Sequence, residues 1–508
     1  MYKFIAKRLG ISALIMLLAS VIMFVLTINS GDPLRDLRES TAANRDHLMA
    51  QRTASMGLNN PWYVRYWDWL RGIGGCFKGQ CDFGMNRSGQ DVNQMLLNAA
   101  STTIRLVLLS TILAIVIGIF FGVMTAIRQY SGFDYTVTFM AFVFYSLPSF
   151  VFAVLLKEYG AIRFNNWLAD PTISIFTSLL IAALFALFTQ AIIAGDKKRR
   201  LLSGGVSFVF ALGALQFISS TRWFQNPSTG IVLPLVVGLA AAILFASLFT
   251  GLGNRRAIYN ALASAVIAVA VVQIFEFRLW EPTWGFLILL LAGLIAVAVA
   301  LGLLTGGYAR RSVVWSNIWV MVSVVIASGA DYMARYWPDY TSLVSNRPIS
   351  TIGSVTPNFR GEDVFWLHFI DLSTHLLLPT ISLTLMSIAS YTRYTRSAML
   401  EVLNQDYVRT ARAKGLPEHT VITRHAFRNA MIPITTIIAF DFAGLIGGAV
   451  ITETVFGWKG MGEMFKTALA NVDPDPVMAF FLVTGGAAVL MNMFADIMYA
   501  YIDPRIRR

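Results

Sequence analysis

The sequence predicts an all-α polytopic membrane protein. Its 508 residues are 56% hydrophobic and only 13% charged, and the mean hydropathy of +0.62 lies outside the range of soluble domains. Apolar runs of about 20 residues, long enough to cross a hydrocarbon core as helices, recur along the whole chain. These runs lack the alternation of apolar and polar residues that marks a membrane β-barrel, and helices satisfy their own backbone hydrogen bonds in lipid.

We expect about twelve membrane spans. The first follows Lys3, Lys7 and Arg8 in the manner of a signal peptide, but it is long and lacks a small-residue cleavage site, so we interpret it as a retained helix. The predicted spans are 9–29, 101–127, 135–157, 172–194, 201–219, 230–252, 257–275, 285–305, 313–331, 375–394, 431–452 and 477–500.

Basic residues in the connections set the orientation, because Lys and Arg near span ends stay on the cytoplasmic side. With the N-terminus inside, the dense clusters at 197–200, 255–256 and 310–311 all fall in the cytoplasm. The inverted topology would place them outside, and we reject it. We therefore expect a multi-pass protein with both termini cytoplasmic. The net charge of +12 then reflects topology and not a nucleic-acid partner.

The middle of the chain contains a repeat. Trp167, Trp223, Trp280 and Trp337 recur every 56 or 57 residues, each with a proline close behind. Between successive tryptophans lie an apolar helix, a short basic turn and a second apolar helix. We interpret 168–337 as three tandem helical hairpins, with each tryptophan at the outer interface. Three hairpins add an even number of crossings, so the flanking spans keep their orientation and the block can be an insertion.

This interpretation divides the chain into three parts. An N-terminal part, 1–160, holds three spans and a long extracytoplasmic loop, 30–100. The inserted block is 161–340. A C-terminal part, 365–508, holds three more spans and a cytoplasmic loop, 395–430.

The only two cysteines, Cys76 and Cys81, lie close together in "CFKGQC" on the loop that we place outside. In an oxidising compartment such spacing favours a small disulfide ring, and two free thiols are the alternative. A zinc site would need further ligands nearby, and the sequence offers none.

The stretch "DYVRTARAKGLPEHTVITRHAFRNAMIP", residues 406–433, forms a charged elbow in the cytoplasmic loop. We expect a helix from about Arg393 to Lys414 that continues the preceding span and stops at Gly415. Pro417 then suits the first turn of a second helix, and Glu418 is favourable near its N-terminus. The sequence therefore predicts a helix-turn-helix knuckle, 406–418, that projects from the bilayer and fits a cleft in a soluble partner.

On these residues the chain resembles the B-type permease subunits of dipeptide/oligopeptide ATP-binding-cassette importers. Those permeases carry a cytoplasmic loop with Glu-Ala-Ala, three residues and Gly, and a proline downstream. Gly415 and Pro433 match the glycine and the proline, whereas Arg409-Thr410-Ala411 stand in the leading positions, so the glutamate is absent. The strings "TINSGDP", "GLNNPWYVRYWDWLRG", "SLPSF", "GGAVITETVFGWKGMG" and "DPRIRR" extend the resemblance over about 1–160 and 365–508; the inserted block has no counterpart.

The resemblance implies a six-helix type I importer core to which the sequence adds about six inserted helices. It implies half of a pathway for di- or oligopeptides in the bacterial cell membrane. The implied partners are a second homologous permease, two ATP-binding subunits and an extracytoplasmic substrate-binding protein. ATP and magnesium would be held by the partner chains, and this chain has no GxxxxGK[ST] loop. We therefore expect a transport subunit with no catalytic residues, metal or cofactor of its own; HExxH and GxSxG strings are also absent.

Two sets of site residues follow. The predicted contact with the ATP-binding subunits comprises Asp406, Arg409, Thr410, Ala411, Lys414, Gly415, Leu416, Pro417 and Glu418; a merely solvated basic loop is the alternative. Asp441 lies inside the 431–452 span, where a carboxylate is costly. It either accepts a peptide's amino group in the pathway or makes a structural hydrogen bond between helices. By resemblance, Glu453 and Trp458 would help to form the outer mouth.

Small residues at i and i+4 let helices approach closely, and Gly118 with Gly122 and Gly444 with Gly448 have this spacing. Each pair serves either packing within the chain or contact with the sister permease.

Three other functions remain open at this point. A permease of the same family for nickel or another solute is the nearest alternative. A self-sufficient secondary transporter would show two related halves, whereas the repeat here is confined to the middle. A membrane enzyme would need a catalytic constellation, which the sequence lacks.

Overall fold

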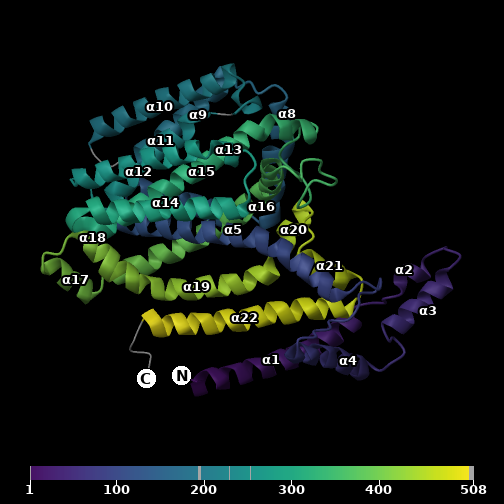
Figure 1. Cartoon of the computed structure of the whole chain (residues 1–508). Helices are drawn as coiled ribbons and strands as arrows, with labels where there is room; N and C mark the ends of the chain where they lie inside the picture. The colour runs from purple at the N-terminus through teal and green to yellow at the C-terminus, as the bar shows by residue number, and fades with distance from the viewer. Residues whose placement is uncertain (1, 193–195, 228, 252, 503–508) are drawn as a thin grey trace.

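The computed structural model describes residues 2–192, 196–227, 229–251 and 253–502. Within these ranges the regular structure is helical, and β pairing is limited to one isolated bridge between Met85 and Asp91. The long helices lie roughly alongside one another (Figure 1). The predicted all-α polytopic class is therefore confirmed. The terminal string "DPRIRR" and the end of the predicted span 172–194 lie outside the described residues.

Among the described residues, nine helices are long and apolar enough to cross a membrane, or ten if one bent pair counts as a span. Nine of the predicted spans coincide with these nine helices. The predicted span 172–194 corresponds to a shorter apolar helix, α9 (Ile175–Ile192), and the predicted span 431–452 to α19 (Phe427–Gly448).

The predicted span 135–157 corresponds to a bent pair of helices. The chain bends by 98° between α6 (Gly132–Ser146) and the helical stretch Ser149–Leu168. Pro148 causes the break, since a residue before proline is driven out of the helical region, and Leu147 is extended at φ −78°, ψ 128°. Beyond the bend the stretch consists of α7 (Ser149–Lys157), a π-helical segment η2 (Glu158–Arg163) and α8 (Phe164–Leu168).

The N- and C-terminal parts of the chain build one bundle around a central pair. Its long helices are α1 (Tyr2–Ile28), α5 (Val92–Ile127), α6, α16 (Phe365–Leu403), α19 and α22 (Pro474–Ile502). The most extensive packing joins α5 to α16, and α6 and α19 both contact α16. On the far side, α1 lies against α22 (Figure 1).

The α5–α16 contact depends on two glycines. A Cβ placed on Gly118 would lie 2.5 Å from the Tyr391 Cβ, and one on Gly122 would lie 2.5 Å from the Thr395 Cβ and 2.8 Å from the Thr392 carbonyl oxygen. These glycines therefore serve packing inside the chain, and contact with a sister permease is excluded for this pair. Gly444, by contrast, has no neighbour within 4 Å, and the surroundings of Gly448 lie outside the described part.

The segment between α1 and α5 is folded. It contains α2 (Arg35–Arg38), α3 (Arg45–Ser55), α4 (Trp62–Gly74) and a 3₁₀ turn, η1 (Gly75–Lys78). The structure joins Cys76 to Cys81 in a disulfide at the end of this segment. The segment lies at the same end of the molecule as α21 (Met461–Ala470) and the start of α22 (Figure 1).

Residues 161–340, which we predicted to be an inserted block, contain a set of helical pairs. Its helices are α9 with α10 (Lys197–Ser220), α11 (Val232–Phe249) with α12 (Arg255–Ile274), and α14 (Trp284–Thr305) with α15 (Arg310–Leu343); the short η3 (Trp223–Gln225), α13 (Glu276–Leu279) and η4 (Gly307–Ala309) lie in the connections. Each helix packs against its partner in the pair, and α15 also packs against α11 and α12. The block occupies the side of the molecule opposite α1 and α22 (Figure 1).

Aromatic and polar contacts attach the block to the core near the ends of α15 and α16. The rings of Tyr332 and Trp366 stack with centroids 5.4 Å apart, and Trp366 Nε1 donates to the Leu279 carbonyl oxygen at 2.7 Å. Farther along α15, the Tyr340 hydroxyl lies 3.2 Å from a carboxylate oxygen of Asp371 on α16. Specific interactions therefore hold this block against α16.

The repeat tryptophans also make contacts that the sequence did not predict. Trp337 Nε1 donates to the Phe224 carbonyl oxygen at 3.0 Å, and Trp167 Nε1 donates to the Thr172 carbonyl oxygen at 2.9 Å. Trp337 therefore joins the end of α15 to the connection that follows α10, whereas the Trp167 bond stays within its own connection. Both contacts are structural and add to the membrane anchoring that we predicted.

Substitution Gly122→Ala tests the close approach of α5 and α16. The added Cβ has no space, so we expect a loss of about 1–3 kcal/mol in stability. Gly213→Ala in α10 is the control, because nothing lies within 4 Å of its added Cβ. Thermal unfolding of the solubilised chain should show a lower midpoint for Gly122→Ala only. Equal midpoints for the two variants would contradict the packing.

Candidate functional site

The knuckle begins where α16 ends. The prediction of a continuous helix from about Arg393 to Lys414 is wrong, because α16 stops at Leu403 and α17 (Asp406–Ala413) starts after Gln405, which is extended at φ −73°, ψ 149°. The turn lets Val408 of α17 pack into a small apolar cluster with Val421 and the end of α16. Burial of these side chains therefore outweighs the favourable helix propensity of the connection.

Gly415 ends α17 as predicted. Its φ of +75° is left-handed, a conformation that glycine adopts without the steric cost paid by other residues. The Gly415 N–H donates to the Arg412 carbonyl oxygen at 2.9 Å, and the Leu416 N–H donates to that of Ala411 at 3.4 Å. This pair of bonds is the Schellman arrangement. A Cβ at Gly415 would meet nothing within 4 Å, so the glycine serves the turn and leaves the space outside it open.

The return helix begins directly after the turn. We expected Pro417 in the first turn of the return helix, but it precedes the first helical residue. The short helix α18 (Glu418–Thr420) leads through a π-helical segment, η5 (Val421–Ala426), into α19. Arg412 Nη2 lies 2.7 Å from Glu418 Oε1, and this hydrogen bond holds the pKa of the Glu418 carboxyl below its usual value. The ion pair links the two helices of the knuckle across Gly415.

The predicted contact residues divide into two groups. Those exposed at the tip and along α17 are Asp406, Arg409, Thr410, Lys414, Gly415, Leu416, Pro417 and Glu418. Ala411 is only 6% exposed and packs with Val408 and Val421, so its prediction as a contact residue is wrong. Tyr407, which the sequence did not single out, is 42% exposed and accepts a hydrogen bond from Asn429 Nδ2 at 2.8 Å. The exposed face therefore carries charges of both signs, with Arg409 and Lys414 against Asp406 and Glu418, and is partly apolar.

Comparison with known proteins supplies the family. The model for the binding-protein-dependent transport system inner membrane component matches residues 258–508, and its N-terminal companion model matches 1–106. A Brucella suis biovar 1 protein named as a peptide permease is 36% identical over 258 residues, which cover 50% of this chain and 75% of that protein. The chain belongs to the family of binding-protein-dependent transport system inner membrane components.

Two further relatives of this permease match over shorter lengths. The oligopeptide transport system permease protein OppB of Mycobacterium tuberculosis is 41% identical over 155 residues, 30% of this chain and 47% of that protein. The dipeptide transport system permease protein DppB of Escherichia coli K12 is 36% identical over 223 residues, 44% of this chain and 65% of that protein. This chain therefore spans about half of OppB and just under two thirds of DppB. The match at 258–508 starts inside the inserted block, at α12.

An ion pair connects α16 of this permease to α6. Arg396 Nε and Nη2 donate to the two carboxylate oxygens of Asp134, each at 2.9 Å. Asp134 is 2% exposed and also accepts from the Tyr130 N–H, in the turn between α5 and α6. The sequence could not reveal this pair, because its members lie 262 residues apart. It joins the α5–α6 turn to the part of α16 that leads into the knuckle.

Asp441 lies on α19 and is half-buried. The Asp441 carboxylate lies near the hydroxyl of Tyr391 on α16, and this hydroxyl has no hydrogen-bond partner among the described residues. Tyr391 in turn packs against Gly118. The polar link between helices and the pathway role therefore both stay predictions for Asp441.

A cavity of about 420 Å³ opens between α6 and α16. Its lining includes Tyr145, Thr392 and Arg393; the Arg393 guanidinium lies 4.2 Å from the centre of the Tyr145 ring, and the buried Thr392 hydroxyl has no hydrogen-bond partner among the described residues. Polar groups of α6 and α16, the two helices that the Arg396–Asp134 pair joins, therefore line this cavity.

Glu453 and Trp458, which we expected at the outer mouth, are only 0% and 2% exposed, and that expectation is wrong. Glu453 lies on α20 (Val450–Phe456); it accepts from Thr103 Oγ1 at 2.7 Å and from the Glu463 N–H at 3.0 Å. These bonds brace α20 and α21 against α5. The Glu453 carboxylate therefore has a structural role, because it accepts hydrogen bonds from both neighbouring segments.

The Arg396–Asp134 pair can be tested by replacing one partner. Asp134→Ala leaves the Arg396 guanidinium without its counter-charge, and we expect about 3 kcal/mol of destabilisation. Asp46→Ala is the control: the Asp46 carboxylate is 86% exposed beside Arg45, and such pairs contribute little. The double variant Asp134→Asn/Arg396→Met should recover part of the loss. Thermal midpoints of the solubilised proteins measure all three effects, and an Asp134→Ala midpoint equal to wild type would refute the role.

Proposed function

We propose that this permease is a subunit of an ATP-binding-cassette importer and forms half of a pathway for di- or oligopeptides. The observation that carries the proposal is the knuckle, an exposed, charged helix-turn-helix that follows the central helix α16 of a family permease and is joined by the Arg412–Glu418 ion pair. The names of the three relatives support peptides as the substrate class. A permease for nickel or another small solute is the alternative within the family.

The proposed assembly contains a second homologous permease, two ATP-binding subunits and an extracytoplasmic substrate-binding protein. ATP and magnesium are bound and ATP is hydrolysed on the partner chains. The basic clusters of the connections support cytoplasmic termini and a cytoplasmic knuckle in a bacterial cell membrane. The exposed cations Arg409 and Lys414 then face the ATP-binding subunits.

A push on the knuckle has a defined route into the membrane. Packing of Val408 with Val421 and the Arg412–Glu418 ion pair make the knuckle one body. That body is continuous with α16 and α19, and the Arg396–Asp134 pair adds α6. Closure of the ATP-binding subunits would therefore tilt α16, α19 and α6 together, a rigid-body change between inward-open and outward-open states.

Gly415→Val is the sharpest test of coupling. Valine disfavours the left-handed conformation by about 1–2 kcal/mol and projects into the open space at the tip. In the assembled importer we expect uptake to fall at least tenfold, while the permease still inserts and ATP hydrolysis continues. Gly415→Asn should retain most uptake, because asparagine tolerates this conformation. Gly251→Val is the control, since Gly251 has φ +80° and equally open surroundings on a turn of the inserted block.

Three quantities are measured in this experiment. Uptake of radiolabelled tripeptide, uptake of nickel, and ATP hydrolysis by co-purified ATP-binding subunits are measured on the same preparations. Peptide uptake by wild type that is abolished in Gly415→Val and kept in Gly251→Val supports the proposal. Full uptake in Gly415→Val would remove the knuckle from coupling, and nickel uptake without peptide uptake would favour the alternative substrate.

A further inference from the structure

Basic side chains gather at the starts of three helices in the block 161–340. The basic groups are 197–200 at the start of α10, 255–256 at the start of α12 and 310–311 at the start of α15. All of these side chains are exposed. The three helix starts lie at the end of the molecule that also carries α17 and the start of α1 (Figure 1). The block therefore presents concentrated positive charge at one end.

The position of these cations on their helices is electrostatically unfavourable. A helix N-terminus carries partial positive charge, so it favours acidic residues and repels basic ones. The first turns of α12 and α15 contain no acidic residue. The sequence has no Asp or Glu within 197–275 or 282–330, and Asp196 is the only acid next to any of the three groups. An anion from outside the chain would offset this charge.

Two of the basic groups are brought together by the packing of α12 against the end of α14. Asn260 Nδ2 donates to the Arg256 carbonyl oxygen at 3.0 Å, and the side-chain oxygen of Asn260 accepts a hydrogen bond from Thr305 Oγ1. The Arg256 guanidinium lies 4.0 Å from the point where a Cβ on Gly307 would be. Arg256 of α12 therefore reaches the turn that leads into α15.

An open hollow of about 660 Å³ lies at this turn. Its lining includes the basic pair Arg310 and Arg311 together with Leu303 and Tyr308. Tyr308 is 93% exposed, and Leu304, the neighbour of Leu303, is 83% exposed. Exposed guanidinium groups and exposed apolar side chains therefore border the same hollow.

The hollow lies where the apolar surface of α14 ends. This helix is long and apolar enough to cross a membrane, and Leu303 and Leu304 at its end are exposed. Arginine just beyond the apolar part of a span reaches the level of the lipid headgroups. The start of α10 has the same arrangement, because the exposed Leu201 and Leu202 follow its basic group directly.

This combination of groups selects one class of ligand. Guanidinium groups bind phosphate through paired N–H donors. A phospholipid offers a phosphate and acyl chains side by side, which matches arginines next to exposed leucines, whereas an acidic soluble protein would leave the leucines uncovered. Choline and ethanolamine headgroups carry an ammonium group, which the cations repel. The complement is therefore a phospholipid with a net negative charge.

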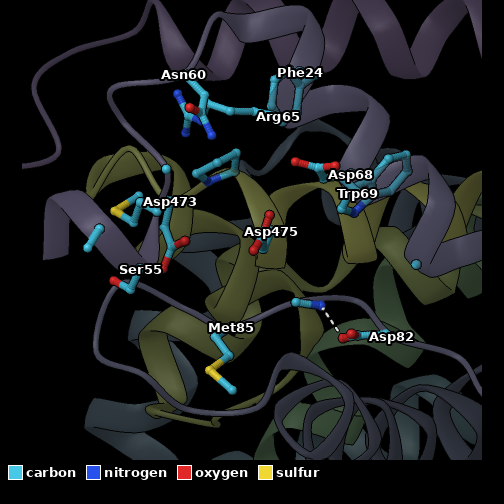
Figure 2. Close-up of a pocket in the computed structure, with 16 residues that line it drawn as sticks. Phe24, Ser55, Asn60, Arg65, Asp68, Trp69, Asp82, Met85, Asp473 and Asp475 are labelled. Carbon is cyan, nitrogen blue, oxygen red and sulfur yellow. Dashed lines mark hydrogen bonds between the residues drawn. The ribbon is translucent and has the colours of Figure 1, made fainter. Parts of the chain in front are cut away.

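The opposite end of the molecule has the opposite charge. A cavity of about 370 Å³ at that end is lined by Asp68, Asp82, Asp473 and Asp475, together with the guanidinium of Arg65 (Figure 2). An excess of carboxylates repels anionic headgroups. The charges of the two ends therefore favour anionic lipid at the end that carries the basic groups.

We propose that the hollow binds the headgroup phosphate of an anionic phospholipid, such as phosphatidylglycerol, between Arg310 and Arg311 of α15 and Arg256 of α12. The acyl chains lie along Leu303 and Leu304 of α14. The lipid thereby fixes the end of the block in the headgroup layer. This site is separate from the knuckle, so it does not depend on the proposed transport.

The experiment measures fluorescence anisotropy of phosphatidylglycerol labelled on its acyl chain, with the delipidated full chain in detergent micelles. Unlabelled phosphatidylglycerol, phosphatidylcholine and inorganic phosphate are the competitors. We expect saturable binding, displacement by phosphatidylglycerol at a concentration about tenfold or more below that of phosphatidylcholine, and no displacement by phosphate in that range. The absence of saturable binding, equal displacement by phosphatidylcholine, or equal displacement by free phosphate would each overturn the proposal.

The double variant Arg310→Gln/Arg311→Gln tests the phosphate contact. We expect binding of phosphatidylglycerol to weaken about tenfold or more, because charge-assisted bonds are lost. Arg35→Gln/Arg38→Gln on α2 is the matched control. It removes the same charge, but each of these guanidiniums already has a carboxylate partner at 3.0 Å. The control should bind lipid as wild type does, and an equal loss in both double variants would contradict the site.

Arg256→Gln tests the contribution of α12 by a single exposed change. We expect a several-fold weaker affinity for phosphatidylglycerol, and wild-type affinity would remove α12 from the site. Co-purification of ATP-binding subunits is measured on the same variants. If Arg310→Gln/Arg311→Gln keeps wild-type lipid binding but loses these subunits, the hollow is a protein contact and the proposal is wrong.

Discussion

The close approach of α5 and α16 is the constraint on which the rest of the structure depends. It requires glycine at 118 and 122, because the space where their side chains would lie is filled by the Cβ atoms of Tyr391 and Thr395. Because α5 fixes the position of α16, the other contacts of the site all involve this one helix. Arg396 joins α16 to α6, Tyr391 lies near Asp441 of α19, and the C-terminal end of α16 leads into the knuckle. A tilt of α16 therefore moves the bundle as a unit.

The N-terminal part of α16 contacts the block 161–340. Trp366 stacks on Tyr332, and Asp371 accepts a hydrogen bond from Tyr340, so α15 packs on the N-terminal part of α16. The knuckle and the block 161–340 therefore contact opposite ends of α16. The contacts of this block lie apart from the faces of α5, α6 and α19 that pack on α16.

Hydropathy and charge predicted the helical class and most helix positions, since long apolar runs have few alternatives in lipid. The glycine spacing of α5 was visible too, but its partner was not, because Gly122 and Thr395 meet only in the folded chain. The Schellman end at Gly415 followed from local sequence. The break after Leu403 did not, because it depends on burying Val408 against Val421, a contact across the turn. The prediction of Ala411 as a contact residue was wrong because Ala411 is buried by the same contact across the turn. The prediction for Glu453 was wrong because a sequence motif does not show which of its residues are buried.

The central claim is that the knuckle faces the cytoplasm, where a separate motor can act on it. Sidedness of Thr410→Cys tests this most directly, since Thr410 is exposed and the two natural cysteines are joined in a disulfide. Spheroplasts and inside-out vesicles are treated with a membrane-impermeant maleimide, and Asp46→Cys on the outer segment serves as the reference. We predict that Thr410→Cys reacts only in inside-out vesicles and Asp46→Cys only in spheroplasts. Labelling of Thr410→Cys in intact spheroplasts would contradict the account.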